Sequence, residues 1–151
     1  MTHHRRRNNG TGTSDTNKAE LSPAQRYAAF KQTQAKQRTV AAEFARSMSF
    51  ELDEFQLQAN EALETGNNVL VAAPTGAGKT VVADFAIYLA QTRNVKAFYT
   101  TPIKALSNQK YHDLVAQYGA DKVGLLTGDT SINSEANIVV MTTEVLRNML
   151  Y

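Results

Sequence analysis

The sequence contains no cysteine and no tryptophan, and it has no long apolar run. Without cysteine it can form neither a disulfide framework nor a zinc site built on thiolates. His3, His4 and His112 also lack the spacing of a metal-ligand set. No stretch approaches the ~20 apolar residues that a membrane-spanning helix needs, and no apolar run follows the N-terminal arginines as it would in a signal peptide. We therefore expect a cytoplasmic protein with no membrane partner.

The first 21 residues are nearly free of apolar side chains and are rich in Gly, Asn, Thr and Ser. Such a segment cannot offset the entropy of ordering, so residues 1–21 are predicted to form a disordered basic tail. Arg5, Arg6 and Arg7 either contact nucleic-acid phosphates or remain a solvated run of charge. The net charge of the whole chain, +2, is too small to predict a nucleic-acid partner by itself.

Residues 22–48 are predicted to form a helical extension. Ser22 suits the N-cap, Pro23 the first helical position, and Gln25 the return contact of a capping box. A helix is expected to continue to about Arg46. Because polar residues interrupt its apolar stripe, we expect a marginal, protruding helix that docks at its ends if it docks at all. The stripe consists of Tyr27, Phe30, Val40, Ala41 and Phe44.

Short apolar runs alternate with longer amphipathic stretches over residues 49–151. This alternation predicts an α/β domain with a parallel sheet that helices cover on both faces. Ligands of such sheets bind at the carboxyl ends of the strands. The expected strands are residues 69–73, 97–101, 123–127 and 138–141, and the expected helices are residues 55–64, 79–91, 103–117 and 144–151.

The stretch "AAPTGAGKT", residues 72–80, has the form of a phosphate-binding P-loop with alanine in place of its first glycine. Its glycines let the backbone curl so that N–H groups face an anion, at the N-terminus of an apolar helix. Lys79 is expected to reach the phosphates of ATP, and the Thr80 hydroxyl to bind Mg²⁺. Both also count as the candidate catalytic residues, and the candidate loop residues are Pro74, Thr75, Gly76, Ala77 and Gly78.

The stretch "FELDEFQLQA", residues 50–59, lies shortly before the P-loop. The amide of Gln56 can present a donor and an acceptor to one edge of adenine. Phe50 is a second candidate contact to the base, whereas Phe55 is better explained by core packing.

Two kinds of role are open to "YTTPIKALSNQK", residues 99–110. Thr101 can end a strand and cap a helix that begins at Pro102. This arrangement suits a well-capped crossover helix, and it also suits a contact to single-stranded nucleic acid through Lys104, with Asn108 and Gln109 one turn further on.

The segments "TGD", residues 127–129, and "TTE", residues 142–144, also follow predicted strands. Asp129 is a poor phosphate ligand because its carboxylate repels phosphate. We expect it to orient its own loop or to pair with a neighbouring cation.

Five segments in order resemble the Q motif and motifs I, Ia, Ib and Ic of superfamily 2 DEAD/DEAH-box-type RNA helicases, in detail the Ski-like (HelY-type) subgroup. They are "FELDEFQLQA", "AAPTGAGKT", "TTPIKALSNQK", "LLTGDTSIN" and "MTTEVLRNMLY", and they span residues 50–151. The resemblance implies a partial RecA-like domain that binds ATP, Mg²⁺ and the backbone of single-stranded nucleic acid, with RNA favoured over DNA. The family's grip on the nucleic-acid backbone falls here on Thr127, Gly128, Asp129, Thr142 and Thr143.

ATP hydrolysis needs an acidic anchor for Mg²⁺ and a group that orients the attacking water. In the resembled family these come from a DExx box that follows a later strand, and the pair Asp53-Glu54 lies before the P-loop instead. The sequence is therefore interpreted as the N-terminal part of an ATP-dependent RNA helicase whose partner is its missing C-terminal half. The piece alone is expected to be inactive in hydrolysis, and to be either prone to aggregation or molten. Alternatives are a non-catalytic nucleotide- and nucleic-acid-binding module, or another class of P-loop ATPase.

Overall fold

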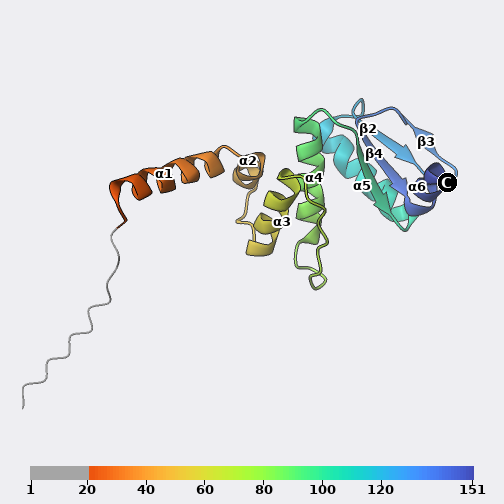
Figure 1. The fold of residues 1–151 in the computed structure, drawn as a ribbon. Helices are drawn as coiled ribbons and strands as arrows, with labels where there is room; N and C mark the ends of the chain where they lie inside the picture. Colours follow the sequence, from red (N-terminus) through yellow and green to blue (C-terminus); the bar gives the residue numbers. More distant parts are fainter. Residues whose placement is uncertain (1–20) are drawn as a thin grey trace, which may run out of the picture. The chain divides into compact units, whose positions relative to one another are not determined.

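The structure, a computed structural model, describes residues 21–151 (Figure 1). The predicted tail, apart from Leu21, and the arginines at positions 5–7 lie outside the described residues. The chain divides into two compact units after Ala35. Among the described residues, no helix combines the length and the apolar composition needed to span a bilayer.

The predicted N-terminal helix is two helices, so the expectation of one continuous helix to Arg46 is wrong. Helix α1 spans Pro23–Gln37 and helix α2 spans Val40–Ser47. The chain breaks because Thr39 is extended and its hydroxyl accepts a hydrogen bond from the Ala42 amide at 3.2 Å, which starts a new helix. The predicted capping box of α1 is confirmed, since Ser22 N–H donates to Gln25 Oε1 and Gln25 N–H donates to Ser22 Oγ.

Helices α2, α3 (Glu54–Glu64) and α4 (Lys79–Thr92) pack together around a small aromatic core. Phe44 of α2 meets Phe85 of α4 edge-to-face, with ring centroids 5.3 Å apart, and Leu89 completes the buried cluster. Of the apolar stripe predicted for the N-terminal helix, Phe44 is therefore buried in α2, whereas α1 contains no buried residue.

The sheet contains β1 (Ala97–Thr101), β2 (Val123–Leu126), β3 (Ser131–Ile132) and β4 (Ile138–Thr142), in the order β1-β4-β2-β3. Strands β1, β4 and β2 are parallel, as predicted, and the two-residue β3 adds an antiparallel edge that the sequence pattern does not predict.

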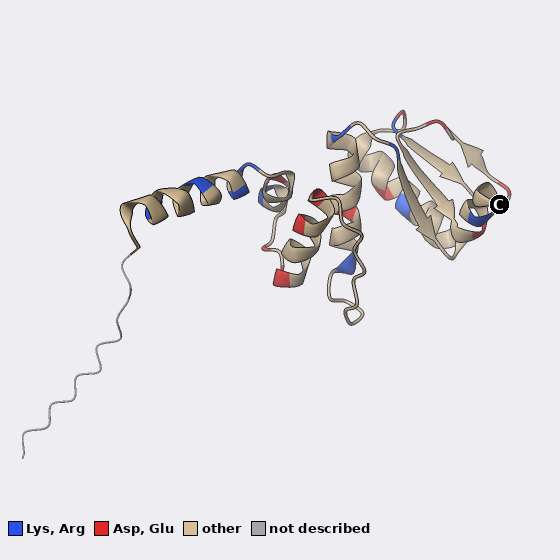
Figure 2. Cartoon of the chain, in the orientation of Figure 1, with Lys and Arg blue, Asp and Glu red and all other residues tan. Residues whose placement is uncertain are grey.

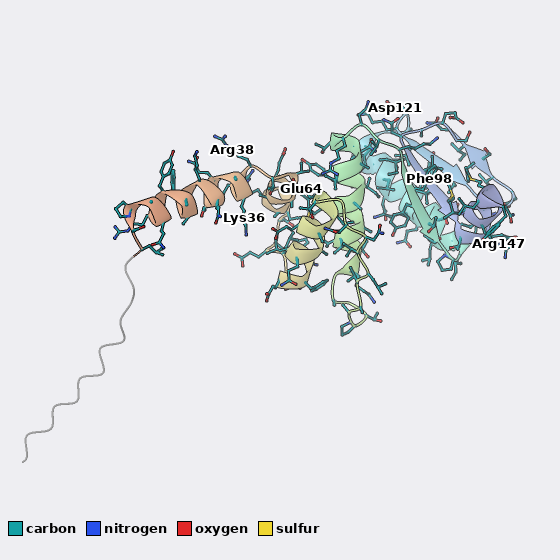
Figure 3. All side chains as sticks on the ribbon, in the orientation of Figure 1. Lys36, Arg38, Glu64, Phe98, Asp121 and Arg147 are labelled. Atoms are coloured by element: carbon teal, nitrogen blue, oxygen red, sulfur yellow. The ribbon has the colours of Figure 1, made fainter. Side chains whose placement is uncertain are left out.

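Helix α5 (Lys104–Tyr118) covers one face of the sheet, where Leu114 packs on Val123, Leu125, Ile138 and Val140. Helix α6 (Thr143–Leu150) contacts β4 and β1. Coverage of both faces is only partly right, because Phe98 is half exposed. Phe98 alternates with Tyr99, which packs in the α5 cluster, so the face opposite α5 is open at β1 (Figure 3).

The predicted strand at residues 69–73 is wrong: this segment pairs with no other strand within residues 21–151. Leu70, in the middle of this segment, is 94% exposed. A strand requires a neighbour that satisfies its backbone groups, and an apolar β-branched sequence alone does not supply one. A groove of about 500 Å³ lies instead between the small residues of α4 and the open edge of β1, lined by Ala83, Ala86, Ile87, Ala90 and residues 97–100.

Candidate nucleotide and nucleic-acid sites

The segment "PTGAGKT" forms a tight loop that leads into α4. Gly76 and Gly78 have φ of +84° and +82°, a region that residues with a Cβ rarely adopt. Gly78 is the N-cap of α4, and its carbonyl accepts from the Val81 amide at 3.2 Å. The amides of Gly76, Gly78, Lys79 and Thr80 donate no hydrogen bond within residues 21–151. Free amides at a helix N-terminus are the donor set that a phosphate group requires.

Lys79 and Thr80 begin α4 and are both exposed. The ammonium of Lys79 donates to the Ala73 carbonyl at 2.8 Å, so the side chain lies across the loop that is predicted to bind phosphate. The Thr80 hydroxyl is available on the first turn of the helix. A hydroxyl oxygen beside free amides fits a Mg–nucleotide complex, because Mg²⁺ takes oxygen ligands and keeps several waters.

Gln56 lies on the first turn of α3 and is 3% exposed. Its Oε1 accepts from the Asp53 amide at 2.8 Å, and its Nε2 donates to the Gly78 carbonyl at 2.9 Å. The side chain therefore joins the start of α3 to the P-loop. One N–H and one oxygen lone pair of the amide remain beyond these two bonds. Adenine reading by Gln56 stays a prediction.

Phe50 is exposed and lines a groove of about 630 Å³ between the end of α2 and α3. Phe55 is only partly buried. A base that stacked on Phe50 would lie in this groove, whose lining is mostly apolar and includes Met48, Leu52 and Leu57.

The three segments predicted to contact nucleic acid come together at the carboxyl ends of parallel strands. Thr101 ends β1 in register with Thr142, and Thr142 ends β4. Strand β2, which lies beside β4, ends at Leu126, immediately before Thr127. The sequence argument that placed these segments at one edge is therefore confirmed in its geometry.

Thr101 does not cap a helix at Pro102, so that part of the prediction is wrong. Helix α5 begins at Lys104 with Ile103 as its extended N-cap, and no side chain caps it. Thr101 is 7% exposed, and its hydroxyl lies 2.8 Å from the Ile103 carbonyl and 2.7 Å from the Ser107 hydroxyl. The hydroxyl therefore fixes the turn between β1 and α5 from inside.

Ser107 is a residue of this edge that the sequence argument misses. It is completely buried in α5, against Thr101. Its position seven residues before the buried Leu114 places both on one helix face, which is the signal that predicts burial of Ser107.

Lys104 and Asp129 form an ion pair with Nζ and Oδ2 2.5 Å apart, both side chains being substantially exposed. Asp129 also accepts from the Thr127 hydroxyl at 2.9 Å. The hydrogen bond from Lys104 first, and that from Thr127 second, lower the pKa of Asp129 below its ordinary value. The expectation that Asp129 orients its own loop and pairs with a cation is confirmed. The same contact neutralises Lys104, the candidate phosphate ligand.

The remaining candidates differ in their access to solvent. Gln109, Gly128 and Thr143 are exposed, Asn108 and Thr142 are partly buried, Thr127 is buried, and Pro102 is exposed. The exposed members and Lys104 can touch a ligand directly, whereas Thr127 and Thr101 shape the loops beneath. Within residues 21–151, no group of three or more His, Asp or Glu side chains is arranged to hold a metal ion.

Comparison with known proteins gives consistent results for the region from α3 onward. The family model described as "DEAD/DEAH box helicase" matches residues 53–151. The "Antiviral helicase SKI2" of Saccharomyces cerevisiae is 55% identical over 107 residues, which cover 71% of this chain and 8% of that protein.

Two other relatives extend this result. A Mycobacterium tuberculosis protein named "Probable helicase HelY" is 64% identical over 108 residues, covering 72% of this chain and 12% of that protein. The crystal structure of a hypothetical ATP-dependent RNA helicase from Sulfolobus tokodaii aligns with a TM-score of 0.53 at 27% identity, over 74% of this chain and 35% of that one. The chain thus spans about a tenth of the length of the curated relatives it matches.

Proposed function

The chain belongs to the DEAD/DEAH box helicase family, and on this basis we propose that it forms the ATP-binding and first nucleic-acid-binding part of an ATP-dependent RNA helicase. The observation that carries the proposal is the cradle at the start of α4. There, two glycines at positive φ and four amides without acceptors lie beside an ammonium and a hydroxyl. This donor set suits a triphosphate tail.

In this proposal the free amides of Gly76, Gly78, Lys79 and Thr80 bind the β- and γ-phosphates. Lys79 leaves the Ala73 carbonyl and donates to a phosphate oxygen. The lost hydrogen bond to the carbonyl is thereby replaced by a charge-assisted hydrogen bond. Thr80 would hold Mg²⁺, whose charge would neutralise the phosphates. Phe50 supports the base, and Gln56 contacts adenine with the donor and acceptor that its two internal bonds leave free.

Single-stranded RNA is the proposed ligand of the edge formed by the ends of β1, β2 and β4. Lys104 provides the cation, and Asn108, Gln109, Gly128, Thr142 and Thr143 provide polar contacts to the sugar-phosphate backbone, while Thr101, Pro102 and Thr127 set the loops. Such contacts carry no sequence information, so binding is sequence-tolerant. The preference for RNA over DNA rests on the relatives' names, such as "ATP-dependent RNA helicase mtr4" of Schizosaccharomyces pombe.

Hydrolysis and strand movement are proposed for the whole protein, together with its C-terminal half, in the cytoplasm. Within residues 21–151 no group of three or more His, Asp or Glu side chains is arranged to hold a metal ion, and the acidic pair Asp53-Glu54 lies before the P-loop. The 151-residue chain alone is therefore proposed to bind Mg–ATP and RNA weakly and to hydrolyse ATP negligibly.

Titration calorimetry with Mg–ATP on a sample verified as folded tests the proposal. We expect saturable binding that Lys79→Ala abolishes, and retention on single-stranded RNA that depends on Lys104. If the folded protein does not bind Mg–ATP, the proposed nucleotide site is contradicted. If the chain alone shows RNA-stimulated ATP turnover that Lys79→Ala removes, the proposal that it is inactive in hydrolysis is contradicted. The control is Lys122→Ala, on an exposed lysine that precedes β2 at the opposite end of the strands.

A further inference from the structure

The N-terminal region differs from the rest of the chain in charge. Residues 1–42 contain eight of the sixteen Lys and Arg but only two of the fourteen Asp and Glu, a net charge of +6, whereas residues 43–151 carry −4. Within residues 21–42 there is no acidic residue at all. Figure 2 shows Lys and Arg on α1 without any Asp or Glu. This basic region lies outside the part that matches the helicase family, residues 53–151.

Helix α1 owes its existence to local sequence and not to burial. Four alanines and four glutamines give it high helix propensity, Ser22 and Gln25 cap it, and none of its residues is buried. A helix of 15 residues without a packed face is only marginally stable in water. A helix of this kind gains stability when a partner binds one of its faces.

One face of α1 combines aromatic and cationic side chains. At 100° per residue, Arg26, Tyr27, Phe30 and Lys31 fall within less than half of the helix circumference, with Gln34 among them. Tyr27 and Phe30 are 62% and 60% exposed, and the Lys31 ammonium lies 5.4 Å from the Tyr27 ring centroid. Lys36 adds a further positive charge on the last turn of α1 (Figure 3).

We propose that α1 is a second RNA-binding surface that holds single-stranded RNA by phosphate contacts and base stacking. Cations that track a backbone and aromatic rings that stack bases are the two elements of sequence-tolerant single-strand binding. A lipid surface fits less well, because α1 has only Tyr27 and Phe30 as large apolar side chains to insert. The choice of RNA as the ligand rests on the proposed function. The α1 surface would add to that function an RNA contact that does not depend on ATP.

The test uses the complete 151-residue chain and a fluorescein-labelled 20-nucleotide oligouridine, with anisotropy measured at several salt concentrations. The double variant Lys31→Gln/Lys36→Gln is compared with Lys96→Gln/Lys122→Gln, which has the same net charge but changes residues before β1 and β2. We expect the α1 pair to lower affinity at least fivefold and to reduce the salt slope by about 1.4, or about 0.7 for each lost phosphate contact. Equal effects of the two pairs would overturn the proposal.

A second variant, Tyr27→Ala/Phe30→Ala, isolates stacking. It keeps every charge and raises helix propensity, and we expect it to weaken RNA binding about fivefold or more. Unchanged affinity would overturn the stacking part of the proposal. Two further outcomes would overturn the whole: tighter binding of the chain to phosphatidylserine vesicles than to RNA, or protection of α1 amides from hydrogen exchange before RNA is added, which would show that the chain itself covers the helix.

The failure of this proposal and that of the proposed function give different results. If Lys104→Gln abolishes RNA binding and the α1 variants change nothing, α1 is not an RNA surface and the edge of the sheet is sufficient. If the α1 variants weaken RNA binding in a chain that binds no Mg–ATP, the α1 surface stands and the proposed nucleotide site fails.

Discussion

The side-chain amide of Gln56 donates to the backbone carbonyl of Gly78 over 2.9 Å, across 22 positions of the sequence. Helix α3 thereby holds the P-loop at its N-cap residue. In Figure 1 the loop before α4 lies beside α3 and away from the sheet. The position of the P-loop therefore depends on this amide and not on a strand that leads into the loop.

Replacing Gln56 with alanine should destabilise the domain. The change leaves the Asp53 amide and the Gly78 carbonyl without their partner, and the loss of such buried contacts costs about 1–3 kcal/mol. Urea denaturation measures the effect. The control is Gln58→Ala on the same helix, whose exposed bond to Glu54 should matter by no more than about 0.5 kcal/mol. Equal destabilisation by both variants would contradict the role of Gln56.

Alanine at Gly78 should cost more than alanine at Gly66. Both glycines have positive φ, +82° and +86°, so both variants lose about 1–2 kcal/mol to backbone strain. Only at Gly78 does the added Cβ fall 2.6 Å from Gln56 Nε2, while at Gly66 nothing lies within 4 Å. Because Gln56 must move and break its hydrogen bond, Gly78→Ala should cost less in a Gln56→Ala background. Strict additivity in a double-mutant cycle of unfolding free energies would refute this coupling.

Glu64 should be needed for the start of α2. Its two carboxylate oxygens accept from the amides of Val40 and Ala41, both at 2.9 Å, at the positive end of the helix (Figure 3). Glu64→Ala is expected to cost about 0.5–2 kcal/mol and to speed hydrogen exchange of these two amides. Glu61→Ala, an exposed position on α3, is the control. Unchanged exchange at Val40 in Glu64→Ala would argue against the contact.

The carboxyl group of Asp129 should titrate below its ordinary range, because Lys104 and Thr127 stabilise the charged form. A folded-state pKa below the unfolded value means that the contribution to stability is present above the unfolded pKa, about 3.9, and is lost as pH falls through the folded pKa. Carboxyl NMR shifts measure the midpoint. Lys104→Gln should move it upward, and a midpoint that does not respond would exclude Lys104 as the main cause.

Asp129→Asn should strengthen RNA binding if the strand-end surface functions as proposed. The change releases Lys104 from an exposed ion pair, which contributes little stability, and the gain in RNA affinity should be no more than about fivefold. Anisotropy at low salt measures the gain. Glu135→Gln, which removes the exposed partner of Lys96 near the opposite edge, should have no such effect. Weaker RNA binding by Asp129→Asn would mean that the order of the 127–130 loop matters more than the free charge.

Features with a local cause are predictable from the sequence. The capping box at Ser22 and Gln25 depends on neighbours three residues apart, and strands 97–101, 123–126 and 138–142 have apolar runs that bury themselves in one sheet. Their shared carboxyl edge follows from parallel topology. The P-loop conformation follows from its two glycines.

Features that depend on distant partners are not predictable in this way. The first two amides of α2 find their acceptor in Glu64, 24 residues after Val40. The strand at residues 69–73 depends on a neighbour that residues 21–151 do not supply. Threonine is a common helix cap, yet the Thr101 hydroxyl is buried and hydrogen-bonds with the Ser107 hydroxyl instead of capping a helix. Propensity describes what a segment can form, and its partners decide what it does form.

Within residues 21–151, strand β1 pairs only with β4, so its other side presents a row of backbone donors and acceptors. The opposite border of the sheet ends in the two-residue β3, which offers a second chain little to extend. Two copies that paired through their β1 strands would present only short outer borders, so a third copy would find little backbone to pair with.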